Sequence, residues 1–347
     1  MSLSLEDLRP FLPGLGNLLD DMDVSELMIN GPGNVWVERA GEGLKPHPAP
    51  DLDAAALHRA AIHIARPLGL DPAAMPIIDA RLDDGSRVAI CVAPATPYTA
   101  ITIRRFGARR FTTGDLVELG SLTPGQVDLI RRTLLGRQNV LVSGGTGSGK
   151  TTLLNALIEL LPPGDRIVAI EDTLELKIGH QNCVRFEARE LGEDSVTIRD
   201  LVKHALRHRP DHIVVGEVRG AEAADLLQAL NTGHGGSLTT IHANNAVSAL
   251  SRLASCAMQA EGALPWDIVC RSVVDGISLV VHTSRIAGVR AVEEVRHLHG
   301  YNAEGKAWQT ARFSEAPAGD AGFFSSGWRP PAPIDKKRWR SAESGRA

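Results

Sequence analysis

Nine consecutive residues near the middle of the chain have the types and spacing that bind the phosphates of a nucleotide. The pattern G-x-x-x-x-G-K-[ST] is complete in this stretch, which reads Gly144, Gly145, Thr146, Gly147, Ser148, Gly149, Lys150, Thr151 and Thr152. Its glycines let backbone N–H groups approach phosphate oxygens, and the start of a following helix adds the positive end of its dipole. We expect Lys150 to reach the β- and γ-phosphates and the Thr151 hydroxyl to bind Mg²⁺. The stretch therefore predicts a nucleoside triphosphate site.

The segments on either side of this stretch have the order that the motif requires. The apolar run 139–143 predicts a buried strand, and residues 151–158 have the pattern of a helix. A glycine-rich turn that only joins a strand to a helix is the alternative. The Lys-Thr pair at the start of the helix argues against it, because the motif needs that pair in that place.

Acidic residues follow two later apolar runs. The strand predicted at 166–170 ends at Glu171 and Asp172, where a carboxylate could accept a proton from the water that attacks the γ-phosphate. A helix N-cap or a solvated turn is the alternative for these acids. The strand predicted at 212–215 is followed by Gly216 and Glu217, at the place where P-loop enzymes usually have a Mg²⁺-binding Asp. Metal contact could therefore pass through water and Thr151.

Two histidines, His234 and His242, bracket the next predicted strand, residues 237–241. Imidazole changes its hydrogen-bonding role easily, so the pair could sense the γ-phosphate or bridge subunits. A single histidine would more often be structural. Two of them at the rim of a nucleotide-binding sheet favour a functional role.

The elements that position these residues follow an alternating order. From residue 140 onward, short apolar runs typical of central strands are separated by helical patterns at 198–207, 221–230 and 247–258. The alternation predicts an α/β domain with a mostly parallel sheet covered on both faces, with ligands at the carboxyl ends of the strands. Runs at 278–282, 289–298 and 307–313 predict a last central strand and a closing hairpin.

The other segments differ in composition and pattern. Residues 1–105 predict a separate α+β domain with an antiparallel sheet, and residues 106–120 predict an interdomain linker without regular structure. Residues 121–314 form the predicted nucleotide domain. Residues 315–347 are rich in Pro, Gly, Ser and Ala and end in a basic, aromatic run, which predicts a disordered tail. Contact of that tail with anionic lipid or a partner protein is the alternative.

Composition excludes several classes of protein. The 37 basic and 41 acidic residues nearly balance, so direct nucleic-acid binding is not indicated. The first thirty residues do not resemble a secretory signal, and no apolar stretch is long enough to span a membrane. We therefore expect a cytoplasmic protein that could bind a membrane peripherally. The four cysteines have no C-x-x-C spacing and predict buried reduced thiols.

Four motifs in this order resemble the secretion-ATPase superfamily. They are the Walker A stretch, the acidic pair after residue 170, the atypical Walker B segment 215–219 and the histidine segment 233–242. The patterns at 26–31, 35–38 and 102–106 resemble the conjugal-transfer and type IV secretion branch in particular. The likeness covers roughly residues 10–314. The chain lacks the Asn-Lys-x-Asp sequence of guanine-specific enzymes and the four-cysteine zinc module of some type II assembly ATPases.

The resemblance implies a RecA-like P-loop NTPase domain preceded by a smaller α+β, PAS-like domain, and a homo-hexamer that binds ATP and Mg²⁺. By that likeness Lys150 and Thr151 hold phosphate and Mg²⁺, Glu171 is the general base and also lies at the metal, and Glu217 supports the metal or water. His242 joins the catalytic set. Arg104 and Arg105 would neutralise γ-phosphate charge, although solvated basic residues at a strand end are the alternative.

The resemblance also implies a function. The implied protein is a hexameric ATPase that is cytoplasmic and peripheral at the inner membrane. It powers conjugative pilus assembly or substrate transfer together with inner-membrane components of a type IV secretion channel. A type IV or tight-adherence pilus motor is one alternative. A nucleotide-gated scaffold with little hydrolysis is a second, and a motor acting directly on DNA is a third.

Overall fold

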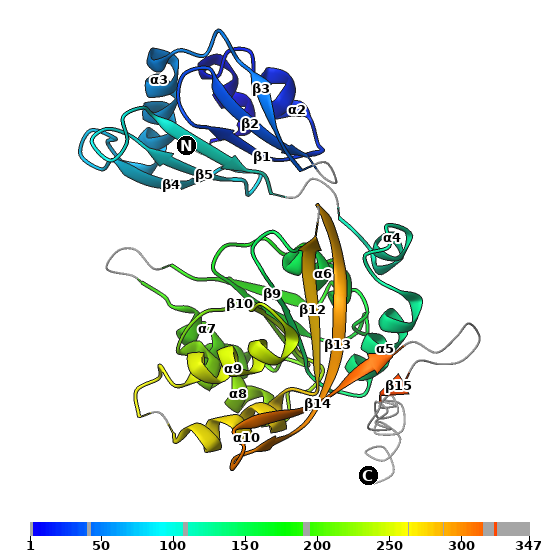
Figure 1. The fold of residues 1–347 in the computed structure, drawn as a ribbon. Coiled ribbons are helices and arrows are strands. Elements are labelled where there is room, and N and C mark those ends of the chain that lie inside the picture. The colour runs from blue at the N-terminus through cyan, green and yellow to red at the C-terminus, as the bar shows by residue number, and fades with distance from the viewer. Residues whose placement is uncertain are drawn as a thin grey trace, which may run out of the picture. The chain divides into compact units, whose positions relative to one another are not determined.

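The computed structural model describes residues 3–39, 43–106, 110–189, 195–262, 264–286, 288–314 and 323–324. The chain divides into two compact units, Met1–Arg109 and Arg110–Ala347, both drawn in Figure 1. The division falls inside the segment predicted as a linker. The predicted tail lies outside the described residues except for Phe323–Phe324. No helix in the described ranges is both long enough and apolar enough to cross a membrane.

The smaller unit is built on an antiparallel sheet of six strands in the order β3-β2-β1-β6-β5-β4. The strands are β1 Val24–Ile29, β2 Asn34–Arg39, β3 Gly43–Pro48, β4 Ile77–Arg81, β5 Arg87–Cys91 and β6 Ala100–Arg104. Its helices are α1 Leu5–Leu8, α2 Gly16–Asp20 and α3 Ala54–Ala65. Alternate strand residues and the apolar face of α3 share one core, which confirms the predicted α+β class for this unit.

The larger unit has a nine-stranded mixed sheet in the order β15-β14-β13-β12-β7-β11-β10-β8-β9. Strands from β9 to β12 in this order are parallel, and the hairpin strands beyond β12 are antiparallel. The strands are β7 Val140–Gly144, β8 Ile167–Glu171, β9 Cys183–Glu187, β10 His212–Val218, β11 Leu238–His242, β12 Leu279–Ile286, β13 Val289–Asn302, β14 Ala307–Ser314 and β15 Phe323–Phe324.

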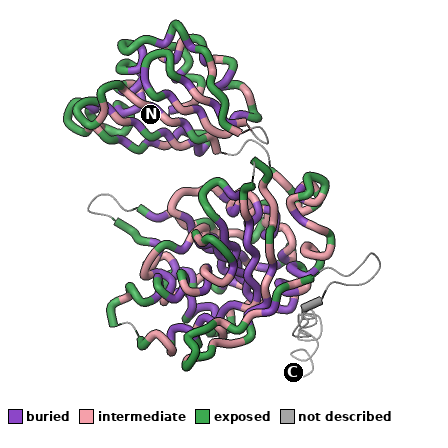
Figure 2. Tube along the Cα trace, viewed as in Figure 1, coloured by how far each residue is buried: buried purple, intermediate pink, exposed green. Residues whose placement is uncertain are grey.

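Helices cover both faces of this sheet. Figure 1 shows α7 Ile198–Ala205, α8 Glu222–Leu230, α9 Ala246–Ala257 and α10 Trp266–Gly276 gathered on one side. The other face carries α4 Thr113–Glu118, α5 Pro124–Leu135 and α6 Lys150–Ile158. Along β7, Leu141 belongs to the first core, while Val140 and Val142 belong to the second. Figure 2 shows the buried residues concentrated along the sheet, so the predicted doubly covered, mostly parallel α/β sheet is confirmed.

Some elements differ from the expectations. The segment predicted as an irregular linker contains α4, which begins with a capping box between Thr112 and Asp115 and is too short to show a helical period. Strands β3 and β9 and helix α10 were not expected either. All four cysteines are reduced, but only Cys256 and Cys270 are buried; Cys91 and Cys183 are half-buried.

Candidate nucleotide site

The phosphate-binding motif forms a tight loop between the end of β7 and the start of α6. Gly147 and Gly149 have φ values of +68° and +96°, a region in which other residues are strained. A Cβ atom at Gly144 would collide with the carbonyl oxygen of Thr283 and the hydroxyl of Ser148. That Ser148 hydroxyl is buried and has no hydrogen-bond partner among the described residues. A glycine-rich loop with a buried hydroxyl and the start of α6 beside it fits the phosphates of a nucleotide.

Lys150 is buried at the first position of α6. Its Nζ donates to the carbonyl oxygens of Gly144, at 3.1 Å, and Gly145, at 3.0 Å. It also lies 3.2 Å from Nε2 of His242, because the parallel register of β11 and β7 places His242 beside Gly144. The ammonium group is thus held at the mouth of the loop by acceptors that a phosphate oxygen could replace.

His242 connects this lysine to the Walker B segment. Burial and the nearby Lys150 charge lower the pKa of His242, so the ring is neutral near pH 7 and its Nε2 accepts from the ammonium. The same Nε2 lies 3.1 Å from Oε1 of Glu217, an oxygen that has no hydrogen-bond partner among the described residues. A break in the β10–β11 register between Val215 and Val218 sets Glu217 at this point.

Glu217 continues the chain of contacts to the acidic segment. Its Oε2 accepts from Nε and Nη2 of Arg219, at 2.8 and 2.6 Å. Nη1 of the same arginine lies 2.7 Å from Oδ2 of Asp172. Contacts therefore run from Lys150 through His242, Glu217 and Arg219 to Asp172. All four sequence motifs meet at the carboxyl ends of the central strands.

Glu171 ends β8 and is 2% exposed. Its Oε2 accepts from the backbone N–H groups of Glu175 and Leu176, both at 2.6 Å, and its Oε1 accepts from Nη2 of Arg185 at 2.9 Å. Burial raises the pKa of Glu171, against the opposing effect of these hydrogen bonds. The carboxylate therefore stabilises the turn after β8. A turn is one of the alternatives predicted for this acid, but here the carboxylate is buried and not solvated.

The two threonines of the motif, Thr151 and Thr152, lie half-buried in the first turn of α6. No group of three or more His, Cys, Asp or Glu side chains in the described ranges could hold a metal ion by itself. A Mg²⁺ ion would therefore depend on the phosphates of the nucleotide for most of its ligands, and Thr151 and Glu217 remain the protein ligands that the sequence predicts.

Comparison with known proteins places this geometry in a family. The family described as type II/IV secretion system protein matches residues 15–311. This chain belongs to that family. It is 38% identical over 287 residues to conjugal transfer protein TrbB of Rhizobium radiobacter, a match covering 82% of this chain and 86% of the relative. It is 32% identical over 314 residues to type IV secretion system protein VirB11 of Brucella suis, covering 81% and 85%. The ATPase DotB of Legionella pneumophila has the same fold, with a TM-score of 0.57 at 21% identity over 84% of this chain and 77% of DotB.

In this member of the secretion family, the two candidate arginines of the smaller unit have different surroundings. Arg104 ends β6, and its side chain is 55% exposed, with Nε 3.6 Å from Oε1 of Glu26. Arg105 donates from Nη1 to the carbonyl oxygen of Asp21, and Nη2 lies 3.8 Å from Sδ of Met22. Arg105 is thus tied to its own unit more closely than Arg104.

The two histidines that bracket β11 lie at opposite ends of this strand, His234 before its amino-terminal end and His242 at its carboxyl end. His234 precedes the strand, and its Nδ1 lies 3.1 Å from the carbonyl oxygen of Ala229. Only His242 lies at the phosphate-binding loop. The strand between them separates the pair that the sequence pattern suggested could act together.

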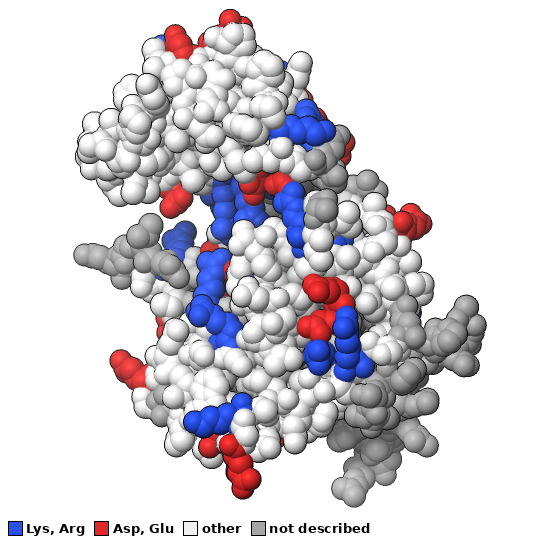
Figure 3. Space-filling view, viewed as in Figure 1, with Lys and Arg blue, Asp and Glu red and all other residues white. Residues whose placement is uncertain are grey.

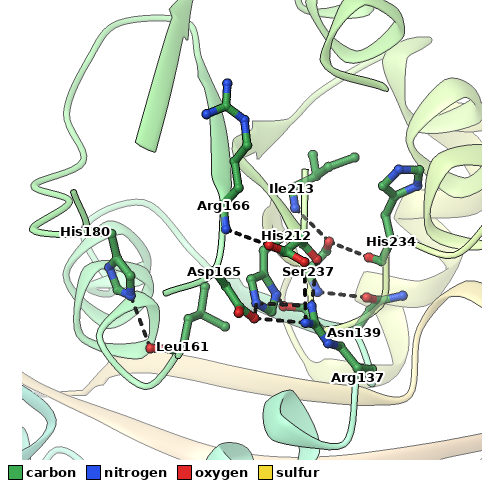
Figure 4. Close-up of polar contacts among 12 residues, drawn as sticks. Arg137, Asn139, Leu161, Asp165, Arg166, His180, His212, Ile213, His234 and Ser237 are labelled. Atoms are coloured by element: carbon green, nitrogen blue, oxygen red, sulfur yellow. Dashed lines mark hydrogen bonds and ion pairs between the residues drawn. The ribbon is translucent and has the colours of Figure 1, made fainter. Parts of the chain in front are cut away.

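Near His234 lies a buried polar cluster that sequence analysis missed, shown in Figure 4. His212 is fully buried, with Nδ1 2.8 Å from the Gly236 carbonyl oxygen and Nε2 2.9 Å from Oδ2 of Asp165. Nη2 of Arg137 donates to the same Asp165 oxygen at 2.9 Å. Burial, and then the Arg137 charge, lower the pKa of His212. The cluster joins the amino-terminal ends of β8 and β10 to the segment before β11, away from the loop. No short motif in the sequence signals it.

Charged side chains on the surface occur in small groups of both signs, as the face drawn in Figure 3 shows. Several are ion pairs within the larger unit, such as Arg132 with Asp128 at 2.5 Å and Arg199 with Asp225 at 2.6 Å. This mixed pattern accords with the near balance of charge in the sequence.

Proposed function

We propose that this chain is an ATPase that hydrolyses ATP to power conjugative pilus assembly or substrate transfer through a type IV secretion system. The observation that carries the proposal is the series of contacts from Lys150 to Asp172, which links all four motifs around one phosphate-binding loop. Two relatives, a conjugal transfer protein and a type IV secretion system protein, support the choice of conjugation or type IV secretion as the process.

In the proposed reaction, Lys150 exchanges the carbonyl oxygens of Gly144 and Gly145 for phosphate oxygens. Mg²⁺, when bound beside Thr151 and Glu217, would offset the negative charge of the β- and γ-phosphates. Once Lys150 has moved, Nε2 of His242 no longer accepts from the ammonium, and in the other tautomer of the ring it donates to the Glu217 oxygen 3.1 Å away. Phosphate binding in the loop thereby changes the hydrogen bonding of the Walker B glutamate, Glu217.

Glu171 is the proposed general base. A pKa raised by burial makes its carboxylate a stronger base near neutral pH. To accept a proton from water, one oxygen must give up Arg185 or a backbone amide. Because Arg185 is the partner from a different strand, β9, we assign the exchange to the Glu171–Arg185 pair.

The proposed working form is a homo-hexamer, cytoplasmic and peripheral at the inner membrane, in contact with inner-membrane components of the secretion channel. Arg104 is the proposed γ-phosphate contact from the smaller unit, since Arg105 is held by Asp21. A motor for type IV or tight-adherence pilus assembly would use the same site and would differ in its partners.

A second candidate, a nucleotide-gated scaffold that binds ATP with little hydrolysis, is favoured by one observation. Both oxygens of Glu171 are engaged in hydrogen bonds that hold the turn after β8. If these bonds persist with ATP bound, no carboxylate oxygen is available to the attacking water.

Steady-state ATP hydrolysis by the wild type and three variants separates the two candidates. Lys150→Ala should lose both ATP binding and turnover. Glu171→Gln should bind ATP but turn over at least about 10²-fold more slowly, the usual contribution of a general base. Arg185→Gln removes the same ion pair while keeping the carboxylate, so it controls for damage to the turn and should retain most of the turnover.

The outcomes show whether Glu171 acts as the general base or only stabilises the turn after β8. Equal losses in Glu171→Gln and Arg185→Gln would show that only the ion pair matters and would remove Glu171 as the base. A wild type that binds ATP in the presence of Mg²⁺ but does not hydrolyse it would favour the scaffold.

A further inference from the structure

The hairpin of β12 and β13 packs against the phosphate-binding loop on the side away from His242. Strand β12 runs parallel to β7, with Thr283 beside Gly144 in register. The Thr283 hydroxyl donates to the carbonyl oxygen of Ser148 at 2.9 Å. The loop is therefore supported by β12 on one side and by β11, which carries His242, on the other.

Two arginines of this hairpin lie over the loop. Arg285 and Arg290 are cross-strand partners. Nε of Arg290 donates to the carbonyl oxygen of Gly147 at 2.9 Å. A Cβ atom added at Gly147 would lie 3.6 Å from Nη1 of Arg285, and one added at Gly149 would lie 3.5 Å from Cδ of Arg290. Both arginines thus approach the backbone at positions that carry no side chain.

The charge and place of this pair indicate an anion as the ligand. Guanidinium groups bind phosphate with strong charge-assisted hydrogen bonds. Both arginines approach the loop that is proposed to bind phosphates, so a phosphate of the nucleotide is the anion that fits this place.

The side of the loop indicates which phosphate. Lys150, which reaches the β- and γ-phosphates in this motif, leans toward His242 on the β11 side. The arginine pair lies on the β12 side. We propose that Arg285 and Arg290 contact the bound nucleotide at its α-phosphate end, as a second cationic contact opposite Lys150. This inference rests on the proposed nucleotide-binding function.

Nucleotide affinity of the full chain tests the pair. Dissociation constants for ATP and ADP, each with Mg²⁺, and for AMP would be measured directly by titration calorimetry for the wild type, Arg285→Gln, Arg290→Gln, the double variant and Lys150→Ala. Each single arginine variant should weaken ATP and ADP alike by about tenfold, because both nucleotides carry the α-phosphate. Arg271→Gln, an exposed arginine of α10, is the matched control and should change nothing.

AMP separates a direct contact from support of the loop. The affinity for AMP should weaken in the two arginine variants and stay unchanged in Lys150→Ala. The melting temperature of Arg285→Gln without nucleotide should stay near the wild-type value, while its rise on adding ADP becomes smaller. A double variant whose ATP, ADP and AMP affinities stay within about twofold of wild type overturns the inference. If the wild type itself binds no nucleotide, the proposed function fails and the inference falls with it.

Discussion

Arg104 and Arg105 are neighbours in the sequence, yet their guanidinium groups have different surroundings. Arg104 lies on a strand beside Glu26, at 3.6 Å, and more than half of its side chain is exposed. Arg105 donates to the Asp21 carbonyl. An arginine that neutralises transition-state charge contributes about 10³-fold or more in rate. We therefore expect Arg104→Gln to lower kcat by about that factor and Arg105→Gln to leave kcat within a few-fold of wild type.

Thermal unfolding supplies the complementary measurement. Arg105→Gln removes a charged donor from a backbone carbonyl, so it should destabilise the smaller unit by about 1.5–3 kcal/mol. Arg104→Gln removes only a long, largely exposed ion pair and should leave its stability within about 0.5 kcal/mol. A large loss of kcat in Arg105→Gln alone would reverse the assignment.

At the residue scale, local spacing predicted some parts of the site and could not predict others. The loop residues follow one another in the chain, so their motif specifies the local geometry that binds phosphate. Glu171 and its partner Arg185 are not close in the sequence. Arg185 comes from β9 and reaches Glu171 through the parallel pairing of β8 and β9. The Asp165–His212 pair likewise joins residues 47 positions apart. Such contacts depend on tertiary packing, which one sequence does not reveal.

Among the elements, length and burial decided what could be predicted. Strands β7, β8 and β10 are apolar runs buried on both faces, and α9 has a clear helical period, so their patterns are strong. Helices α1 and α2 have four and five residues, too few to show a period. Strand β9 is at an edge and only half-buried, so its residues do not stand out from a loop.

Strand β13 carries a histidine that should make stability depend on pH. His297 pairs with Leu279 of β12 and Ala311 of β14, and burial lowers its pKa to about 4. An unfolded histidine has a pKa of about 6.5. Between these values the unfolded state binds more protons, so stability falls as pH decreases through this window. We expect protonation of His297 in the unfolded state to lower the free energy of unfolding by about 2 kcal/mol between pH 7 and pH 5.

Chemical denaturation at the two pH values checks this expectation. The transition of the larger unit can be followed by fluorescence, because Trp266 and Trp308 both lie in it. His297→Gln should reduce the loss of unfolding free energy between pH 7 and pH 5 by about 2 kcal/mol. His58→Gln, at an exposed site of α3, should leave the loss unchanged. An equal pH dependence in wild type and His297→Gln would show that His297 has the same pKa in the folded and unfolded states.

For the whole molecule, the proposed hexamer makes mass and activity depend on each other. A net charge of −4 on 347 residues gives little electrostatic opposition to self-association. If the working site is completed in the assembly, Mg-ATP should shift the mass from the single chain of 37.1 kDa to six times that value. Turnover per chain should then fall when the protein is diluted below the concentration at which the hexamer forms.

Mass photometry and hydrolysis on the same samples test this dependence, with Lys150→Ala as the variant that cannot respond to ATP. The variant should keep its nucleotide-free mass distribution after ATP is added, because the lysine that binds phosphate is gone. Full turnover per chain by a monomer at every dilution would show that each site is complete in one chain and would remove the hexamer from the proposal. A hexamer that forms with ATP but does not hydrolyse it would instead favour the scaffold, in which ATP binding alone changes how the assembly interacts with its partners.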